Sequence, residues 1–451
     1  MTTTIKSLTA ISLAFGLFCS PIFAAVPPSE VPKLGTSLTP AGAEKAGNAS
    51  GEIPAWEGGL PQNAGAVDSK GFLADPFSAE KPLFVITAQN MDKYKERLTP
   101  GQQAMFKRYP ETYRMPVFKT HRTAGFPQNW FDMTRKNATE VNLVAGGNGV
   151  ENFHGGIPFP IPQNGLEVIS NHQNHYAQSM RRDFNVVSPM PDGAYTMVRM
   201  DDEIMPFFDM KNPPDNLKFY LKISVTSPAR LAGDVTLIHE PLDQVKEPRS
   251  AWIYNAGQRR VRRAPQVAYD GPGTASDGMR TQDNYDMFNG APDRYDWQLV
   301  GKKEMYIPYN SYRLDSPSLK YDEIIKAGHV NQDLTRYELH RVWHVTATLK
   351  PEMRHIYAKR DFYIDEDSWL VAEVDHYDGR GTLWRVGEAH AQFYYHKQLP
   401  WYTIETLYDL VAGRYHVIGL KNESPHSWAF RPADLQESSF TPAALRQAGI
   451  R

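Results

Sequence analysis

The stretch Leu217-Lys-Phe219-Tyr-Leu221-Lys-Ile223-Ser-Val225 alternates apolar residues with polar or exchangeable ones along its whole length. Successive side chains of a β-strand point to opposite faces, so the apolar members of this stretch share one face. The alternation therefore predicts a half-buried β-strand. The fold class follows from the sequence on either side of this strand.

Further strands are predicted beyond this stretch. Residues 252–254 and 259–263 flank the turn Asn255-Ala-Gly257, which predicts a β-hairpin. The remaining strands are joined by close turns and cover residues 235–238, 337–349, 355–364, 369–377 and 382–395. The pattern contains no alternation of strands and helices and no repeat of fixed period. We therefore expect an α+β fold in which residues 217–397 form one large antiparallel sheet with helices on one side.

Capping signals predict four short helices. Thr99 and Gln102 form a capping box, and Asn164 is a suitable N-cap residue. The helices are expected over residues 88–98, 100–109, 165–181 and 442–448. Residues 25–82 are rich in Pro, Gly and Ala, so we expect an extended N-terminal strap there and one domain over residues 25–451.

The N-terminus has the parts of a secretory signal. Lys6 supplies positive charge, Leu8 to Phe18 form an apolar run, and Ala24 ends a suitable cleavage site. The apolar run is shorter than the roughly 20 residues that cross a bilayer. The one cysteine, Cys19, follows Phe18 and therefore lacks the small residue that precedes a lipidated cysteine. We expect residues 1–24 to be a cleaved signal peptide and the mature protein to be periplasmic, without disulfides.

Composition and motifs exclude several functions. The net charge of -2 offers no overall attraction to nucleic acid. The chain lacks the glycine-rich nucleotide motifs and the G-x-S-x-G nucleophile motif. His172 and His175 are spaced for one metal ion, but no third ligand is identifiable, and ordinary packing is the better interpretation. We expect no cofactor, no metal ion and no catalytic residues.

A basic hairpin arm and several aromatic residues are the candidate ligand contacts. Arg260 and Arg262 would share one face of a strand and bind an anion, since Arg holds phosphate or carboxylate through two hydrogen bonds. The alternative is an edge strand that carries charge to prevent aggregation. Val261 would face the other side with Trp252 or Tyr254. The aromatic strand residues that would line a ligand site are Trp252, Tyr254, Trp343 and Trp384.

Several long stretches carry a resemblance to a known family. They are Leu38–Asn48, Ile53–Trp56, Gly156–Pro162, Tyr269–Gly278, Asp283–Gly290, Asp293–Trp297 and Tyr306–Asn310. With them the chain resembles the bacterial family called domain of unknown function 1329 (DUF1329).

A fainter likeness covers residues 217–397. Trp252–Tyr254, Arg260–Arg263, Ser276-Asp277 and Tyr357–Asp365 resemble the core of outer-membrane lipoprotein-sorting proteins of the Lol type. That resemblance implies a curved antiparallel sheet, forming an incomplete β-barrel, with helices packed on its concave side and an apolar cavity for acyl chains.

The expected function is that of a periplasmic carrier for a hydrophobic or amphipathic ligand, a lipid or an acylated partner, serving envelope assembly or an exporter. By resemblance, an inner-membrane exporter or an outer-membrane component would be its partner. One alternative is a hydrolase acting on envelope glycans or lipids through unidentified carboxylates. Another is a docking subunit of a transporter that uses the Pro-rich N-terminal region.

Overall fold

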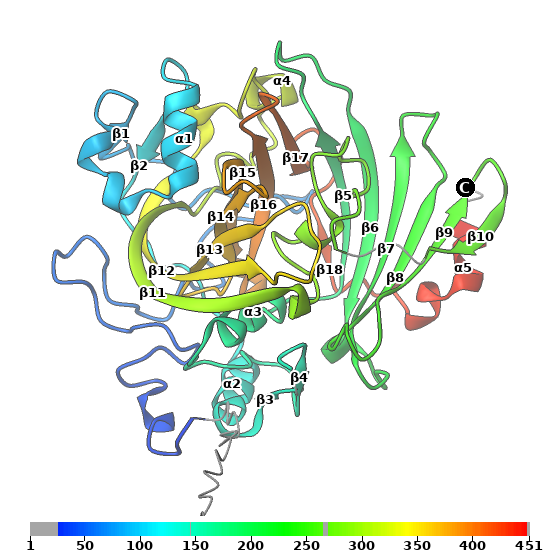
Figure 1. Ribbon diagram of the computed structural model, residues 1–451, viewed down its shortest axis with the longest axis horizontal. Helices are drawn as coiled ribbons and strands as arrows, with labels where there is room; N and C mark the ends of the chain where they lie inside the picture. Colours follow the sequence, from blue (N-terminus) through cyan, green and yellow to red (C-terminus); the bar gives the residue numbers. More distant parts are fainter. Residues whose placement is uncertain (1–25, 145, 265–268, 449–451) are drawn as a thin grey trace, which may run out of the picture.

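The computed structural model describes residues 26–144, 146–264 and 269–448 (Figure 1). The predicted signal peptide and its cleavage site after Ala24 lie outside the described residues. Within those residues, no helix combines the length and apolar character that a membrane span requires.

One large sheet dominates the molecule. Along the sheet its strands are β1 (Phe84–Ile86), β2 (Met115–Val117), β12 (Tyr337–Leu349), β13 (Lys359–Asp365), β14 (Val371–Tyr377), β15 (Leu383–Tyr394), β16 (Leu399–Asp409), β17 (Arg414–Leu420), β5 (Met180–Val187), β6 (Val198–Pro206), β7 (Leu217–Ser227), β8 (Val235–Pro241), β9 (Ser250–Asn255) and β10 (Arg260–Arg263). β11 (Tyr295–Pro308) pairs with β12, and β18 (Ala429–Phe430) pairs with β5. The pairs are antiparallel except for one parallel contact between β2 and β12. A separate small ribbon joins β3 (Asn142–Leu143) and β4 (Val150–Glu151).

The sheet extends beyond the predicted bounds of residues 217–397. Strands β16, β17, β5 and β6 lie between β15 and β7 and join the two parts of the predicted core. Hairpin pairing of neighbouring strands follows from local turns, whereas the pairing of β17 with β5 joins segments more than 200 residues apart. Local periodicity carries no information about such a partner, which explains the difference.

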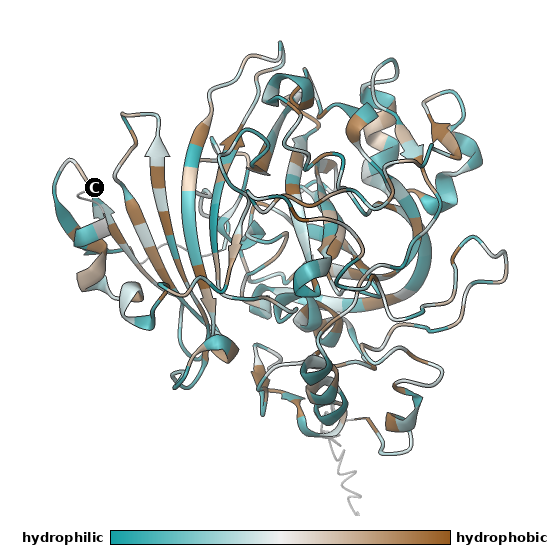
Figure 2. Cartoon of the chain, turned by 180° about the vertical axis from the view of Figure 1, so that it is seen from behind, coloured by the Kyte–Doolittle hydropathy of each residue, from teal (hydrophilic) through white to brown (hydrophobic). Residues whose placement is uncertain are grey.

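The sheet is strongly curved and open. A single core cluster contains Leu221 and Ile238 from one part of the sheet and Phe362 and Val374 from the other. These two pairs of strands are separated by five others in the sheet order, so the sheet must bend around the cluster. Among the described residues, β10 and β11 do not pair, and the barrel stays incomplete. Figure 2 shows hydrophobic and hydrophilic residues alternating along the outer strands, as the period-2 pattern predicts.

The helices agree with the prediction at their capped ends. α1 (Pro100–Arg108) begins with the predicted capping box of Thr99 and Gln102. α3 (Gly165–Gln173) is capped by Asn164 but ends before Arg181, because β5 starts at Met180. α5 (Pro442–Ala448) lies where it was expected.

The helix predicted over residues 88–98 is wrong. Two 3₁₀ turns, Met91–Lys93 and Lys95–Arg97, take its place. The Asn90 side chain accepts a hydrogen bond from the Thr87 amide and donates one to the Val85 carbonyl. Such local bonds compete with helix formation. The prediction missed α2 (Gln128–Glu140), which begins after Pro127 without a side-chain cap, and the single turn α4 (Tyr321–Ile324).

The helices cover both faces of the sheet. α2 and α3 contribute Trp130, Val168 and Ile169 to the core on the concave face. α1 contributes Met105 and Phe106 to a core on the outer face, and α5 contributes Leu445 to a further outer core over β7–β9. Residues 26–83 contain one 3₁₀ turn and otherwise neither helix nor strand.

Candidate functional site

A long connection lies inside the curve of the sheet. Residues 269–294, which we call the inner segment, link β10 to β11 and cross the concave face. Polar contacts hold the inner segment in place. Asp283 accepts a hydrogen bond from Arg360 on β13, and Met287 donates its amide to Glu405 on β16. The carbonyl of Asp286 accepts the Nε2–H of His172 on α3 at 2.8 Å.

The inner segment is held in a conformation that costs energy. Asp286 and Met287 are consecutive residues with φ of 53° and 59°, in the left-handed region that residues other than glycine rarely adopt. Ala275 and Asp277 share that conformation. Strained residues persist where the surrounding structure holds them and cluster at functional sites.

A groove runs between the inner segment and the concave face of β5, β6 and β7. Three cavities lie along it. The outer cavity is bounded by Val186 and Val198, the middle one by Phe184, Met200 and Ile223, and the deep one by Ile204, Phe207, Phe208 and Phe219. On β5 and β6 these are alternate residues, so they lie on one face of the sheet. The middle and deep cavities share Tyr285, Asp286 and Trp401.

The groove is long but narrow. Val198 and Ile204 lie six residues apart on β6, which corresponds to roughly 20 Å of strand. The space open to the centre of a water molecule is about 410 Å³ in the outer cavity, 30 Å³ in the middle one and 40 Å³ in the deep one. A single water needs roughly 10–15 Å³ by this measure. The inner segment therefore closes most of the groove to anything larger than a few waters.

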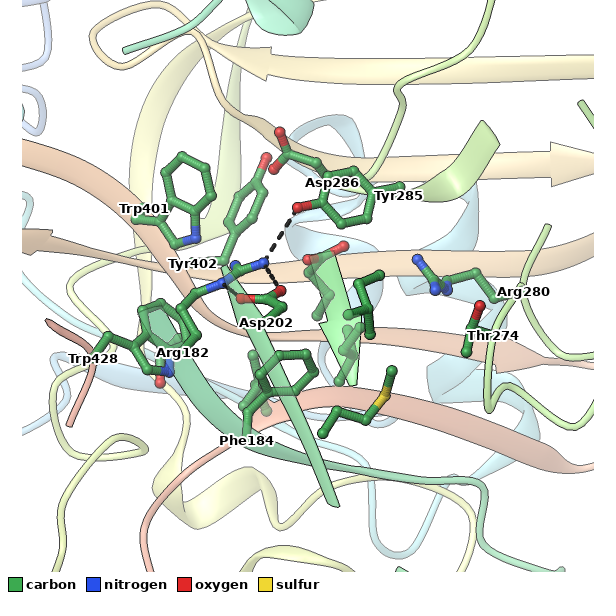
Figure 3. A pocket seen from close by; sticks show the side chains of 17 residues that line it. Arg182, Phe184, Asp202, Thr274, Arg280, Tyr285, Asp286, Trp401, Tyr402 and Trp428 are labelled. Carbon is green, nitrogen blue, oxygen red and sulfur yellow. Dashed lines mark hydrogen bonds and ion pairs between the residues drawn. The ribbon is translucent and has the colours of Figure 1, made fainter. Parts of the chain in front are cut away.

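An ion pair lies at the boundary of the middle cavity. Arg182 on β5 donates to Asp202, its cross-strand partner on β6, and to the hydroxyl of Tyr285 at 3.2 Å (Figure 3). Its guanidinium group also lies 5.8 Å from the ring centre of Trp401 and 5.4 Å from that of Trp428. Asp202 neutralises the buried charge of Arg182, and the two aromatic rings pack against its guanidinium group.

A second set of charged groups surrounds Asp286. Burial alone would raise the pKa of this carboxyl, but His175, with its Nε2 at 2.8 Å from the Asp286 carboxylate, lowers that pKa to about 2. Burial lowers the pKa of Lys218 to about 8. Burial, followed by the negative charge of Asp286, raises the pKa of Glu405 to about 7. The groove therefore combines an apolar lining with a polar patch where the inner segment crosses β16.

The basic hairpin forms as predicted, but on another part of the molecule. In the β9–β10 hairpin Val261 pairs with Tyr254, and Arg262 with Ile253. Val261, Trp252 and Tyr254 pack in the core under α5, on the outer face of the sheet. Arg260 and Arg262 are exposed on the opposite side of β10.

The other two predicted aromatic residues lie apart from each other. Trp343 on β12 stacks on Trp369 with 6.1 Å between the ring centres. Trp384 on β15 donates its Nε1–H to Asp409 at 2.9 Å. The structure does not bring the six predicted residues together, and none of them lines the three cavities of the groove. Their assignment to a ligand site stays a prediction.

The residues of the groove were missed for an identifiable reason. Met180-Arg-Arg182-Asp-Phe184-Asn-Val186 alternates in the manner of a strand, but the predicted helix over residues 165–181 concealed its beginning. The Gly and Asp residues of the inner segment are typical of turns and give no sign that the segment crosses the sheet. The alternation after Met180 was the available signal.

One group of side chains has the spacing of metal ligands. Ligand atoms of His340, Asp365 and Asp367 lie within 4.8 Å of one another and are buried. Arg122 occupies both carboxylate oxygens of Asp367, at 2.6 and 2.8 Å. The Nε2 of His340 lies 3.2 Å from Glu338. This arrangement is that of an internal ion-pair network, with one carboxylate oxygen of Asp365 left without a partner.

The fold and the groove define a class of protein. It is an α+β protein whose open, curved antiparallel sheet encloses a groove covered by the protein's own chain. The chain belongs to the family described as protein of unknown function (DUF1329), whose family model matches residues 85–446. The family membership expected from the sequence motifs is thereby confirmed.

One relative is similar over its whole length. The uncharacterized protein PA3922 of Pseudomonas aeruginosa is 64% identical over 444 residues, which cover 97% of each chain.

Three solved structures overlap with part of the chain. A DUF1329 family protein from Desulfovibrio piger is 15% identical with a TM-score of 0.41, covering 60% of this chain and 92% of that one. A putative outer membrane lipoprotein-sorting protein domain from Vibrio parahaemolyticus is 13% identical with a TM-score of 0.43 and coverage of 62% and 98%. A LolA superfamily protein from Nitrosomonas europaea is 12% identical with a TM-score of 0.37 and the same coverage.

Proposed function

We propose that this protein binds and carries an amphipathic ligand whose apolar part lies in the groove under the inner segment. The observation that carries the proposal is the row of Phe184, Val186, Val198, Met200 and Ile223, which faces a cavity on the concave face. The groove from Val198 to Ile204 is roughly 20 Å long and exceeds one leaflet of a bilayer, which is half of about 30 Å. The groove therefore matches an apolar chain of lipid length in its extent along the strands.

Binding requires the inner segment to move. The narrow middle cavity admits no acyl chain in the described conformation. The segment has no helix longer than one 3₁₀ turn and is held by individual hydrogen bonds and ion pairs. Such irregular segments open at a lower free energy than packed strands. The inner segment is therefore the part of the molecule suited to release and enclose a ligand.

The expected location agrees with such a role. The predicted signal peptide sends the chain out of the cytoplasm, and the chain after Cys19 contains no cysteine. A periplasmic carrier would exchange its ligand with a membrane exporter or an outer-membrane component. These partners remain part of the proposal.

The hydrolase alternative has less support. The Oγ of Ser188 lies 2.9 Å from the Nδ1 of His416 at the edge of the outer cavity. Burial lowers the pKa of His416 to about 3, which makes this ring a weak base at neutral pH. The paired carboxyls Glu373 and Glu388 are buried beneath the outer core, where Gln102 and Tyr337 bind them.

The proposal is tested by what the protein carries. Native mass spectrometry of protein purified from the periplasm should show bound lipid-sized ligands. Ile223→Trp fills the middle cavity and should reduce the bound fraction at least tenfold. Val411→Trp adds the same bulk at a position that is 71% exposed and should change nothing. Wild-type protein without ligand, or equal occupancy in both variants, would count against the proposal.

A further inference from the structure

Arg280 has no ion-pair partner in the part of the chain that the structure describes. It belongs to the inner segment and lines the middle cavity. Its Nε–H is shielded from solvent and has no hydrogen-bond acceptor. Among the described residues no carboxylate forms an ion pair with Arg280, and in Figure 3 no dashed line reaches it.

The fully buried arginines near the groove are all neutralised, whereas Arg280 is partly buried. Arg182 pairs with Asp202, Arg360 with Asp283, and Arg385 with Asp409. Water reaches part of the Arg280 side chain and offsets some of the cost of its unpaired charge, and an anion bound in the cavity would offset the rest.

Glu405 is the carboxyl whose negative charge acts most strongly on Arg280, but the two groups form no ion pair among the described residues. Its charge attracts the guanidinium group, but one of its oxygens accepts the Met287 amide at 3.1 Å. Burial raises the pKa of Glu405 to about 7, so the carboxyl is only partly ionised near neutral pH. The guanidinium group of Arg280 is therefore free to pair with another anion.

The cavity around Arg280 suits an amphipathic ligand, because it combines apolar side chains with polar groups. The cavity around it is lined by the apolar side chains of Met200, Ile223 and Ile418. Thr274 lies beside Arg280 in Figure 3 and adds a hydroxyl group. A planar guanidinium group binds a carboxylate or a phosphate through two charge-assisted hydrogen bonds.

We infer that the ligand of the groove is an anionic amphiphile, and that Arg280, with Thr274, binds its carboxylate or phosphate while the apolar chain lies along β5 and β6. This inference rests on the proposed carrier function. Under this inference the site selects its ligand by the negative charge of the headgroup as well as by the shape of the apolar chain.

The test compares two probes with the same chain and different heads. cis-Parinaric acid carries a carboxylate, and its methyl ester is uncharged. Wild-type protein should bind the acid about 10- to 100-fold more tightly than the ester. This is the gain in affinity expected from charge-assisted hydrogen bonds between Arg280 and the carboxylate. Arg280→Gln should remove this preference and leave the affinity for the ester unchanged, and Arg280→Lys should retain part of it.

Two controls separate folding from recognition. Arg280→Gln removes an unpaired charge, so its melting temperature should not fall below that of wild type. Arg380→Gln changes an arginine whose side chain is 84% exposed and should leave both affinities unchanged. Competition by lysophosphatidic acid against a free fatty acid distinguishes a phosphate headgroup from a carboxylate.

The possible outcomes distinguish a failure of the inference on Arg280 from a failure of the carrier function. Equal binding of acid and ester by wild-type protein, or an unchanged preference in Arg280→Gln, overturns the inference and leaves the carrier function standing. Failure of the wild-type protein to bind either probe counts against the carrier function itself.

Discussion

Arg182 and Arg280 lie in one cavity but are stabilised in different ways. Arg182 is held by Asp202, Tyr285 and two tryptophan rings, while Arg280 has a threonine nearby and no ion-pair partner among the described residues. The first arrangement is a structural ion pair that fixes β5 against β6. The second leaves a charge available, which is why only Arg280 is assigned to the ligand.

The ion pair should dominate stability at this site. Asp202→Asn leaves Arg182 buried without its charged partner, and breaking a buried pair on one side costs about 3–5 kcal/mol. Urea unfolding should show a loss of this size in the free energy of unfolding. The double change Arg260→Gln and Arg262→Gln, on the exposed side of β10, should cost less than about 0.5 kcal/mol. Equal losses in the two variants would contradict the prediction.

At the scale of the element, the inner segment decides whether the groove is open. It has five residues other than glycine in the left-handed conformation, at positions 269, 275, 277, 286 and 287. Their strain is offset by contacts with α3, β13 and β16. Loss of a few of these contacts would therefore favour the open form.

A covalent link between the inner segment and the sheet should trap the ligand. Ala275 and Val198 pack in the same apolar cluster at the outer cavity. With Ala275→Cys and Val198→Cys, oxidation should slow the release of cis-parinaric acid at least tenfold, because the segment can no longer lift from β6. Release is followed by fluorescence in stopped flow.

Reduction of the same double variant provides the matched control and should restore the wild-type rate. Each single cysteine variant should behave as wild type under both conditions. Equal release rates in the oxidised and reduced protein would show that the ligand exchanges without movement of this segment.

At the scale of the whole molecule, many ionisable groups are buried with shifted pKa values. Burial raises the pKa of Asp375 to about 8 and that of Glu388 to about 7. Glu388 lies directly opposite Glu373 on the neighbouring strand, so these two carboxyls favour sharing a proton. Burial also lowers the pKa of several histidines, His172 to about 4 and His416 to about 3.

The balance of these groups predicts the pH dependence of stability. Above pH 6.5 the histidines of the unfolded chain lose their remaining protons, so their opposing contribution fades and is gone above about pH 7.5. The carboxyls are protonated in the folded protein and ionised in the unfolded chain, so the folded state binds more protons. The free energy of unfolding should therefore decrease as the pH rises from 6.5 to 8. Between about pH 4 and 6.5 the histidines and carboxyls oppose each other.

Asp375→Asn tests this assignment. It removes one raised pKa and should flatten the loss of stability between pH 6.5 and 8, measured by urea unfolding across that range. Asp378→Asn changes an exposed carboxyl of the following turn and should leave the slope as it is. A free energy of unfolding that rises over this range in wild type would contradict the prediction.

The sequence by itself determined the local structure. The alternation after Leu217, the hairpin around Asn255 to Gly257, the capping box at Thr99 and the cap at Asn164 were all predictable. Each depends on hydrogen bonds or side-chain directions among residues close in the chain. The family followed from long continuous motifs.

Only the tertiary structure decided the order of the sheet and the position of the groove. Trp252 and Tyr254 pack beneath α5 on the outer face, while Phe184 and Met200 line the groove. Periodicity assigns residues to a face but does not say which face encloses a cavity. That choice arises when β17 pairs with β5 and the inner segment folds across the sheet, contacts between segments distant in the chain. The charge of Arg280 is unpaired because that packing places none of the described carboxylates against it.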